Sequence, residues 1–419
     1  MLAWIPSLVG LVTTLIPQLS ELPPTGLASA AQAPVTLGID VLLSERGELL
    51  KGKRVGMLTH AAAVDGALIP SVDRLVRGQK DGGYKVMQLW GPEHGLRGYF
   101  QPGEKAGGSD DPKSGVPVEN LFGRGKKGRP SKKAIARVDV IVVDLQDLGS
   151  RTYTYISTLG ELMLAAKDAG KSVIVVDRPN PASGLVFEGP ILARGLESFI
   201  GWGPLPVTHG MTIGEVARFY NDALGTGCDL TVVAMKGWRR AMLWPDTGLE
   251  WIPTSPGIPH VQNAWLYPAT GMVGGISDNV SEGVGTSLPF ELIGAEFIDP
   301  EKLAAALAKQ QLPGVKLRPV TYRPASFKFK GKVLGGVQLH VTDMRAFRPI
   351  RTALAVLVAL QKLWPGKAEY RDQSASIVWG TPAVLKAVAA GKSVAQIEGT
   401  WTKGLEDFAA KREKALLYE

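Results

Sequence analysis

Residues 138–177 read VDVIVVDLQDLGSRTYTYISTLGELMLAAKDAGKSVIVVD and carry the clearest fold signal in the chain. The two ends, 138–145 and 172–177, are short continuous apolar runs, which is typical of strands buried on both faces of a parallel sheet. Between them, residues 158–169 have the spacing of a helix, and Gly170 follows as the residue expected just beyond a helix end. Strand, helix and strand in succession predict a unit of an α/β sheet.

The same alternation extends on both sides of this stretch. Residues 212–224 predict another helix, because Thr212 stands three residues before Glu215 in the pattern of a capping box. We therefore expect a Rossmann-like, doubly wound parallel α/β domain over residues 35–245. Its other strands are expected at residues 54–59, 85–91 and 230–235.

A second, smaller α/β domain is expected over residues 246–419. The stretch 244–290 is rich in Pro, Gly and Trp, which predicts a long functional loop region at the domain junction. Beyond this region, helices are expected at residues 300–311, 350–363 and 393–414, and a strand is expected at residues 333–341.

Composition excludes several classes of protein and partner. The 419 residues are 45% hydrophobic and 21% charged, an ordinary globular composition rather than a disordered one. The formal net charge is +8, but the dense basic run at residues 124–133 has no aromatic side chain to stack on a base, so no nucleic-acid partner is expected. A single cysteine, Cys228, excludes an intramolecular disulfide.

Metal and nucleotide cofactors are not expected either. The five histidines show no HExxH or similar ligand spacing, and one cysteine cannot build a thiolate site. The segment after the first expected strand, THAAAVDG at residues 59–66, lacks both the GxGxxG and the Walker A patterns that hold phosphates. The sequence contains no GxSxG, which disfavours an α/β-hydrolase triad.

The first 33 residues differ from the rest of the chain. Residues 1–17 form an uncharged apolar run and residues 21–33 end in small residues, so we predict a signal peptide cleaved near Ala30 or Ala33. The pattern departs from the usual one because no Lys or Arg precedes the apolar stretch. We expect export to the periplasm or the cell exterior. We expect no membrane insertion after processing, because no later run reaches the roughly 18 apolar residues of a membrane span.

Polar side chains gather where the expected strands end. In an open parallel sheet, ligands bind beyond the carboxyl ends of the strands. The segments found there are rich in carboxylates, arginines and tyrosines, which predicts a polar small-molecule site at this edge. They are His60, residues 91–98 (GPEHGLRG), residues 144–155 (DLQDLGSRTYTY), residues 177–181 (DRPNP) and His209.

Seven strings occur in a fixed order along the chain: GPEHGLRG, DLQDLGSRTYTYISTL, DRPNP, EGPIL, HGMTIGE, NVSEGVGTSLPFELIGA and GVQLHVTD. In this order they resemble the bacterial family of exo-β-N-acetylmuramidases. The resemblance implies a Rossmann-like N-terminal domain and a smaller C-terminal domain, with the active site in the cleft between them. It also implies an exo-acting glycoside hydrolase that needs no cofactor. That enzyme would release N-acetylmuramic acid from the non-reducing ends of peptidoglycan fragments.

Carried over to this sequence, the resemblance makes Glu93 the catalytic acid. A carboxyl that follows a buried strand between two glycines would lie in a partly dry cleft, which favours the protonated form needed to protonate a glycosidic oxygen. The second catalytic group of a glycosidase is expected to be Asp144 or Asp147, and Glu282 is the next candidate. As an alternative, Glu93 caps a helix and each aspartate caps a turn. Retaining, inverting and acetamide-assisted routes all stay open.

N-acetylmuramic acid carries a lactyl carboxylate, which calls for an arginine, preferably a bidentate one. Arg97, Arg151 and Arg178 are expected to hold it, with pairing to a nearby aspartate as the alternative for each. The other candidates are expected to hydrogen-bond to the sugar or to stack on it, and their alternative is a role in core packing or local structure. They are His60, His94, Tyr153, Tyr155, Asn180, His209, Asn279 and Glu282.

The chain departs from the family pattern at three places. His60 stands where asparagine is usual, Val284 stands where arginine is usual, and residues 255–259 read SPGIP where SPNMP is usual. These departures support an alternative interpretation, a non-catalytic protein that binds cell-wall fragments in the same cleft. The strand-end carboxylates and arginines match the pattern, and from them we expect the hydrolytic activity to be retained.

Overall fold

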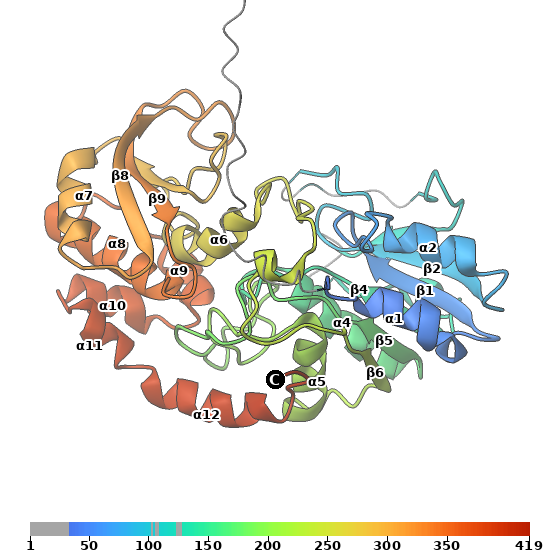
Figure 1. Cartoon of the computed structure of the whole chain (residues 1–419). Helices are drawn as coiled ribbons and strands as arrows, with labels where there is room; N and C mark the ends of the chain where they lie inside the picture. Colours follow the sequence, from blue (N-terminus) through green and yellow to red (C-terminus); the bar gives the residue numbers. More distant parts are fainter. Residues whose placement is uncertain (1–32, 102–103, 105–108, 123–127) are drawn as a thin grey trace, which may run out of the picture. The chain divides into compact units, whose positions relative to one another are not determined.

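Six parallel strands form the main sheet of the computed structural model, which describes residues 33–101, 104, 109–122 and 128–419. The strand order is β3-β2-β1-β4-β5-β6, so the order reverses between β1 and β4, as expected for a doubly wound sheet (Figure 1). The predicted signal peptide, apart from Ala33, lies outside the described residues, as does part of the basic run at 124–133. The strands are β1 (Arg54–Thr59), β2 (Lys85–Gly91), β3 (Val118–Asn120), β4 (Val140–Asp144), β5 (Ser172–Val176) and β6 (Leu230–Val233).

Helices cover both faces of this sheet, which explains why its strands are continuously apolar. Ile141 and Val143 of β4 share a buried cluster with α4 and α5, whereas Val140 and Val142 share one with α1 and α2. The capping box predicted at Thr212 is present at the start of α5. The helices of this part are α1 (Gly38–Glu45), α2 (Ser71–Gly78), α3 (Lys132–Ile135), α4 (Tyr155–Asp168) and α5 (Ile213–Ala223), with 3₁₀ helices at Gly47–Leu49 and Trp244–Thr247.

A second, smaller sheet lies in the C-terminal part and is antiparallel, in the order β7-β9-β8. It packs with α6 and α8 around a separate buried cluster. None of the helices in the described ranges is long and apolar enough to cross a membrane. The elements are α6 (Val261–Gly274), β7 (Leu292–Ala295), α7 (Pro300–Ala308), β8 (Val315–Tyr322), β9 (Leu334–Val341), α8 (Pro349–Leu363), α9 (Asp372–Trp379), α10 (Ala383–Ala389), α11 (Val394–Glu398) and α12 (Thr402–Glu413).

Several local predictions were wrong. Helix α6 lies inside the stretch predicted as loop, because one of its faces, with Leu266 and Met272, is buried in the C-terminal core. Strand β8 was missed, since most of its residues are only half-buried or exposed and give no continuous apolar run. The helix predicted at 393–414 is broken between α11 and α12, where Trp401 turns into the core. Helix α4 starts at Tyr155 rather than at residue 158.

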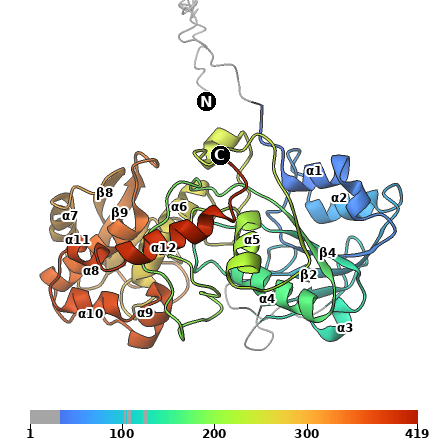
Figure 2. The ribbon, with the colours of Figure 1, turned by 90° about the horizontal axis from the view of Figure 1, so that it is seen from below.

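The last helix and the C-terminal residues return to the main sheet (Figure 2). Arg412 Nη2 donates to the Gly210 carbonyl at 2.6 Å. The Tyr418 hydroxyl donates to Asp177 Oδ2 at 2.6 Å, just beyond β5, and accepts from Met235 N at 2.9 Å. Residues Pro34–Glu419 therefore form one compact unit. The domain boundary expected between residues 245 and 246 stays a prediction.

Candidate active site

A pocket of about 580 Å³ lies where the segments after β2 and β4 meet helix α6 and loops of the C-terminal part. We call it the Glu93 pocket. Both parts of the chain contribute to its wall, which explains why no single stretch of sequence reveals it. Its lining residues are Glu93, His94, Thr152, Tyr153, Thr154, Ser255, Pro256, Gly257, Ile258, Tyr267, Glu282, Val284, Gly285, Thr286, Pro289, Phe290, Ala325, Ser326 and Phe327.

A tight turn after β2 presents Glu93 to this pocket. Within the turn, Gly95 N donates to the Pro92 carbonyl at 2.9 Å. His94 takes a φ of +69°, the left-handed region that is costly for a residue with a side chain, and its ring Nδ1 contacts the Phe100 carbonyl at 2.9 Å. A strained backbone that neighbouring groups hold in place fixes the direction of the adjacent side chain.

The carboxyl of Glu93 is also held directly. Thr154 Oγ1 donates to Glu93 Oε2 at 2.9 Å. Thr154 is itself fixed, because it immediately precedes helix α4 and its carbonyl accepts from Thr158 Oγ1 at 3.1 Å. One carboxyl oxygen is thus tied to the framework while the residue lines the pocket.

Glu282 brings a second carboxyl to the same pocket. Its side chain packs against Gly274 of α6, where a Cβ atom would collide with the carboxyl group. Among the described residues, no side chain donates a hydrogen bond to it, and burial raises its pKa above the usual range of a glutamate. Lys328 and Arg371 lower this pKa by a smaller amount. The structure therefore pairs Glu93 with Glu282 in one pocket.

Aromatic rings form one side of the pocket. The Tyr153 and Tyr267 rings meet edge to face with centroids 5.8 Å apart, and Tyr267 meets Phe290 in the same way at 5.0 Å. Burial, with smaller contributions from Glu93 and other carboxylates, raises the pKa of Tyr267 to about 12. Its phenol therefore stays an uncharged donor at ordinary pH.

Asp144 and Arg178 do not reach the pocket, because they bind each other. Both side chains are buried, and the guanidinium pairs with the carboxylate through two hydrogen bonds, of which the Nη2–Oδ2 bond measures 2.9 Å. Arg178 Nη2 also donates to the Val64 carbonyl at 2.8 Å. Neither Asp144 nor Arg178 is therefore placed to contact a substrate in this pocket. Pairing with a nearby aspartate, the alternative stated for Arg178, is what the structure shows.

Asp147, His209 and Asn180 are likewise buried and do not line the pocket. Asp147 Oδ2 accepts from Gly149 N at 2.7 Å and lies 3.3 Å from His209 Nε2. Asn180 Nδ2 donates to the Met211 carbonyl at 2.9 Å. The three side chains thus order the loops that follow β4 and β5.

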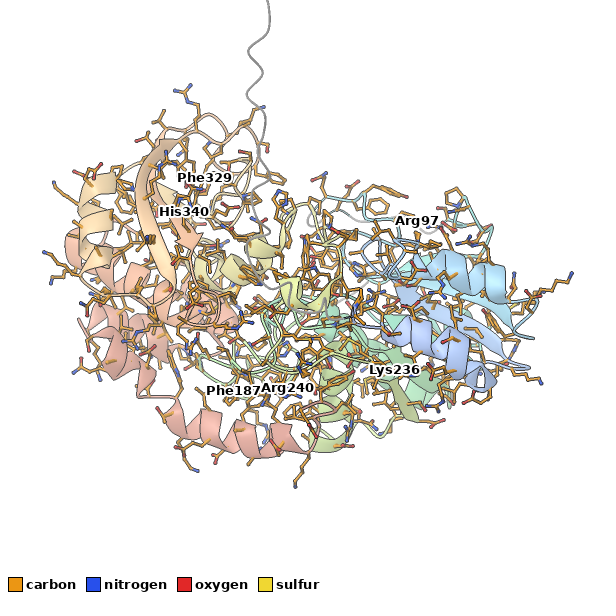
Figure 3. The ribbon with its side chains drawn as sticks, in the orientation of Figure 1. Arg97, Phe187, Lys236, Arg240, Phe329 and His340 are labelled. Atoms are coloured by element: carbon orange, nitrogen blue, oxygen red, sulfur yellow. The ribbon has the colours of Figure 1, made fainter. Side chains whose placement is uncertain are left out.

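The other two arginines of the expected clamp also have partners within the protein. The buried Arg151 guanidinium donates to the carbonyls of Pro190, Leu205 and Val378 at 2.8–2.9 Å, and burial lowers its pKa to about 9. Arg97, labelled in Figure 3, pairs with Asp111 at 2.8 Å and with Asp73 of α2 at 3.1 Å. No arginine or lysine is among the described residues that line the Glu93 pocket.

His60, Tyr155 and Asn279 also lie outside the pocket wall. His60 Nε2 accepts from Gln146 N at 3.0 Å, and burial holds the pKa of its imidazole well below the usual range. The Tyr155 hydroxyl donates to the Thr254 carbonyl at 2.8 Å. Asn279 Nδ2 donates to the Lys367 carbonyl at 2.8 Å. Each of these side chains supports a loop near the pocket.

Of the residues singled out from the sequence, the structure brings together Glu93, His94, Tyr153 and Glu282 in the pocket. Thr154 and Tyr267 were missed. Thr154 stands between Tyr153 and Tyr155 in the sequence, so including threonine hydroxyls among the candidate donors would have found it. Tyr267 lies on α6, in the stretch predicted as loop, and gave no signal. Within the described ranges, no group of three or more His, Cys, Asp or Glu side chains is arranged to hold a metal ion.

Comparison with known proteins gives consistent matches. The N-terminal family profile of exo-β-N-acetylmuramidase NamZ matches residues 55–262, and the C-terminal profile matches residues 265–418. The chain is 41% identical over 391 residues to the peptidoglycan β-N-acetylmuramidase NamZ of Bacillus subtilis strain 168, covering 93% of each protein.

Two solved structures of DUF1343 family proteins from Bacteroides fragilis NCTC 9343 share the fold. One has a TM-score of 0.85 at 35% identity and the other a TM-score of 0.73 at 27% identity. Each alignment covers 92% of this chain and 99% of the solved chain.

Replacing Asp144 by alanine is expected to lower the free energy of unfolding by about 3–5 kcal/mol, because it leaves the buried Arg178 charge without its partner. Denaturant-induced unfolding measures this change. The control is Asp407→Ala, which removes an exposed pair with Lys403 (2.7 Å) and should cost roughly 0.5 kcal/mol or less. Equally small losses in both variants would contradict a structural role for Asp144.

Proposed function

The chain belongs to the exo-β-N-acetylmuramidase NamZ family, and we propose that the Glu93 pocket is its active site. The protein is an exo-acting glycosidase that releases N-acetylmuramic acid from the non-reducing end of peptidoglycan fragments. The proposal concerns which residues perform this reaction. The observation that carries it is the presence of two carboxyls, Glu93 and Glu282, in one pocket walled by aromatic rings. Two carboxyls favour hydrolysis over binding alone, since most glycosidases use such a pair.

Glu93 is assigned as the catalytic acid. Thr154 donates to one of its carboxyl oxygens, and no described residue donates to the other, which can protonate the glycosidic oxygen of a bound sugar. The strained turn at His94 supports the same role, because a proton donor must be held within hydrogen-bond reach of the leaving group.

Glu282 is assigned as the second carboxyl in place of Asp144 and Asp147. Retaining, inverting and acetamide-assisted hydrolysis all place a second carboxyl beside the sugar. Asp144 is paired with Arg178, and Asp147 is buried and does not line the pocket, whereas Glu282 does. The charge of Asp147 still contributes to the raised pKa of Tyr267, so Asp147 acts on the site through its field.

The lactyl carboxylate of the substrate is proposed to meet neutral donors rather than an arginine clamp. The pocket wall offers the hydroxyls of Ser255 and Ser326, and the tyrosine phenols. Val284, which stands where the family pattern usually has arginine, also lines the pocket. This chain therefore lacks a cation at a position that faces the substrate.

Export fits this substrate, and we propose that the N-terminal residues act as a signal peptide that delivers the enzyme to the periplasm or the cell exterior. The apolar run at residues 1–17 and the small residues that follow it support the proposal. N-terminal sequencing of the extracytoplasmic protein checks it. A first residue just after Ala30 or Ala33 agrees with cleavage, and an intact Met1 contradicts it.

Glu93→Gln is expected to reduce release of N-acetylmuramic acid from a MurNAc-GlcNAc disaccharide by about 10²- to 10⁴-fold, because an amide has no acidic proton to transfer to the leaving oxygen. With an aryl glycoside whose leaving group needs no proton, the loss should be much smaller. Glu282→Gln should lower turnover on both substrates.

Thr152→Ser, which keeps a hydroxyl at the pocket wall, is the control and should retain most activity. A Glu93→Gln protein with full activity on the disaccharide would overturn the assignment of the acid. Equal losses for Glu93→Gln on both substrates would show that Glu93 does not act as a proton donor.

Val284→Arg is expected to lower the KM for the disaccharide by about tenfold, because a new charge-assisted hydrogen bond to the lactyl carboxylate is worth roughly 1.4 kcal/mol. Steady-state kinetics with Val284→Gln as the uncharged control measures the effect. The improvement should vanish when the lactyl carboxylate is converted to an amide. A KM that does not change, or an equal change in the control, would place the lactyl group away from Val284.

A further inference from the structure

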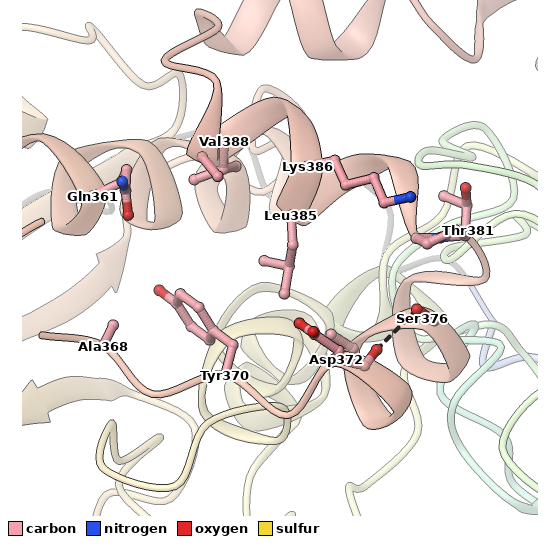
Figure 4. A pocket seen from close by; sticks show the side chains of 12 residues that line it. Gln361, Ala368, Tyr370, Asp372, Ser376, Thr381, Leu385, Lys386 and Val388 are labelled. Atoms are coloured by element: carbon pink, nitrogen blue, oxygen red, sulfur yellow. Dashed lines mark hydrogen bonds between the residues drawn. The ribbon is translucent and has the colours of Figure 1, made fainter. Parts of the chain in front are cut away.

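A second pocket, of about 400 Å³, lies among α8, α9 and α10 in the C-terminal part (Figure 4). Its lining residues are all distinct from those of the Glu93 pocket. The established reaction therefore gives it no role. We call it the Lys386 pocket after its cationic residue.

The middle of the Lys386 pocket is apolar. Ala375 and Val388 are buried in the core beneath it, and the side chain of Leu385 stands at its centre (Figure 4). An apolar middle of this size suits small aliphatic groups such as methyl groups and methylene chains.

Two unpaired charges border this apolar middle. Lys386 and Asp372 both line the pocket, and neither forms an ion pair with any residue in the described ranges. Lys386 lies at the same end as Thr381, whose Oγ1 accepts from Ala383 N at 3.2 Å and still has its own proton to donate (Figure 4). This end is suited to bind a carboxylate, and Asp372 is suited to bind an ammonium group.

The opposite end of the pocket holds an unsatisfied phenol. The Tyr370 hydroxyl is buried and has no hydrogen-bond partner among the described residues, and burial raises its pKa above the usual tyrosine range. Leaving a buried hydroxyl unpaired costs roughly 1–3 kcal/mol, so a ligand that pairs with it gains free energy. Gln361 lies at this end too and can pair with an amide (Figure 4).

We propose that the Lys386 pocket binds a short peptide with a free carboxylate, a free ammonium group and small side chains. Lys386 and Thr381 would hold the carboxylate, Asp372 the ammonium group, and Tyr370 a peptide amide. A sugar phosphate or nucleotide fits less well, because the pocket wall offers one cation and one carboxylate. The source that we infer is the peptide stem of cell-wall fragments, and this choice of source rests on the proposed function.

The position of Tyr370 links this pocket to the active site. Residues 367–371 are hydrogen-bonded to the loop that leads to Glu282: Asp278 N donates to the Glu369 carbonyl at 2.9 Å, and Arg371 N donates to the Ile276 carbonyl at 3.0 Å. Asn279, which the sequence suggested as a sugar ligand, joins the same two segments: its Nδ2 donates to the Lys367 carbonyl and its Oδ1 accepts from Glu369 N. Backbone hydrogen bonds thus join the segment that carries Tyr370 of the Lys386 pocket to the loop that carries Glu282 of the Glu93 pocket.

Calorimetric titration of the full chain with the tripeptide L-Ala–γ-D-Glu–meso-diaminopimelate tests the proposal. The wild-type protein should bind the tripeptide, and Lys386→Ala should weaken binding by about tenfold through loss of one charge-assisted hydrogen bond. Lys392→Ala removes an exposed positive charge outside the pocket and is the matched control, with unchanged binding expected. Tyr370→Phe should weaken binding severalfold.

Three outcomes would overturn the proposal: no binding at millimolar tripeptide, equal weakening by Lys386→Ala and Lys392→Ala, or equal binding of a tripeptide whose carboxylates are all amidated. The same proteins are assayed on a peptide-free MurNAc-GlcNAc disaccharide. If the wild type releases no N-acetylmuramic acid but binds the tripeptide through Lys386, the proposed function fails and the peptide site stands. If release is normal and the tripeptide does not bind, the peptide site fails and the proposed function stands.

Discussion

The buried ion pair between Asp144 and Arg178 lies at the point where the strand order of the main sheet reverses, and the site depends on it. Asp144 ends β4, Arg178 follows β5, and the guanidinium also binds the Val64 carbonyl after β1, so one side chain ties together the ends of three strands. In many Rossmann-like proteins the crevice at this point holds a ligand. Here a small cavity of about 20 Å³ lies beside Arg178 and Trp244. Under the proposed assignment, substrate binds in the larger Glu93 pocket, of about 580 Å³.

The strand-end residues consequently divide into two groups with different tasks. Those after β4 and β5, including Asp147 and Arg151, are buried and satisfy backbone groups that would otherwise be left unpaired. Among the described strand-end residues, those that line the Glu93 pocket come from the turn after β2 and from the residues just before α4. In the proposed assignment the second carboxyl comes from the C-terminal part, where Glu282 lines the pocket beside helix α6.

The sequence predicted the main sheet well because continuous apolar strands and a capping box are local signals, as in 138–145 and at Thr212. It also pointed to Glu93, which lies two residues beyond the end of β2 and lines the pocket. It could not tell whether Arg178 pairs with an aspartate of the protein or binds the lactyl carboxylate of the substrate, because both roles need an arginine at a strand end. Tyr267 was missed since an interior proline and the surrounding glycines hid its helix, which tertiary packing stabilises.

The most direct test of the account is a crystal structure of the Glu93→Gln protein with a MurNAc-GlcNAc disaccharide bound. The account predicts that the glycosidic oxygen lies within about 3 Å of the residue 93 side chain, with the muramyl ring against Tyr267 and Glu282 beside it. A disaccharide bound elsewhere, or bound in this pocket with its glycosidic oxygen beyond reach of residue 93, would contradict it.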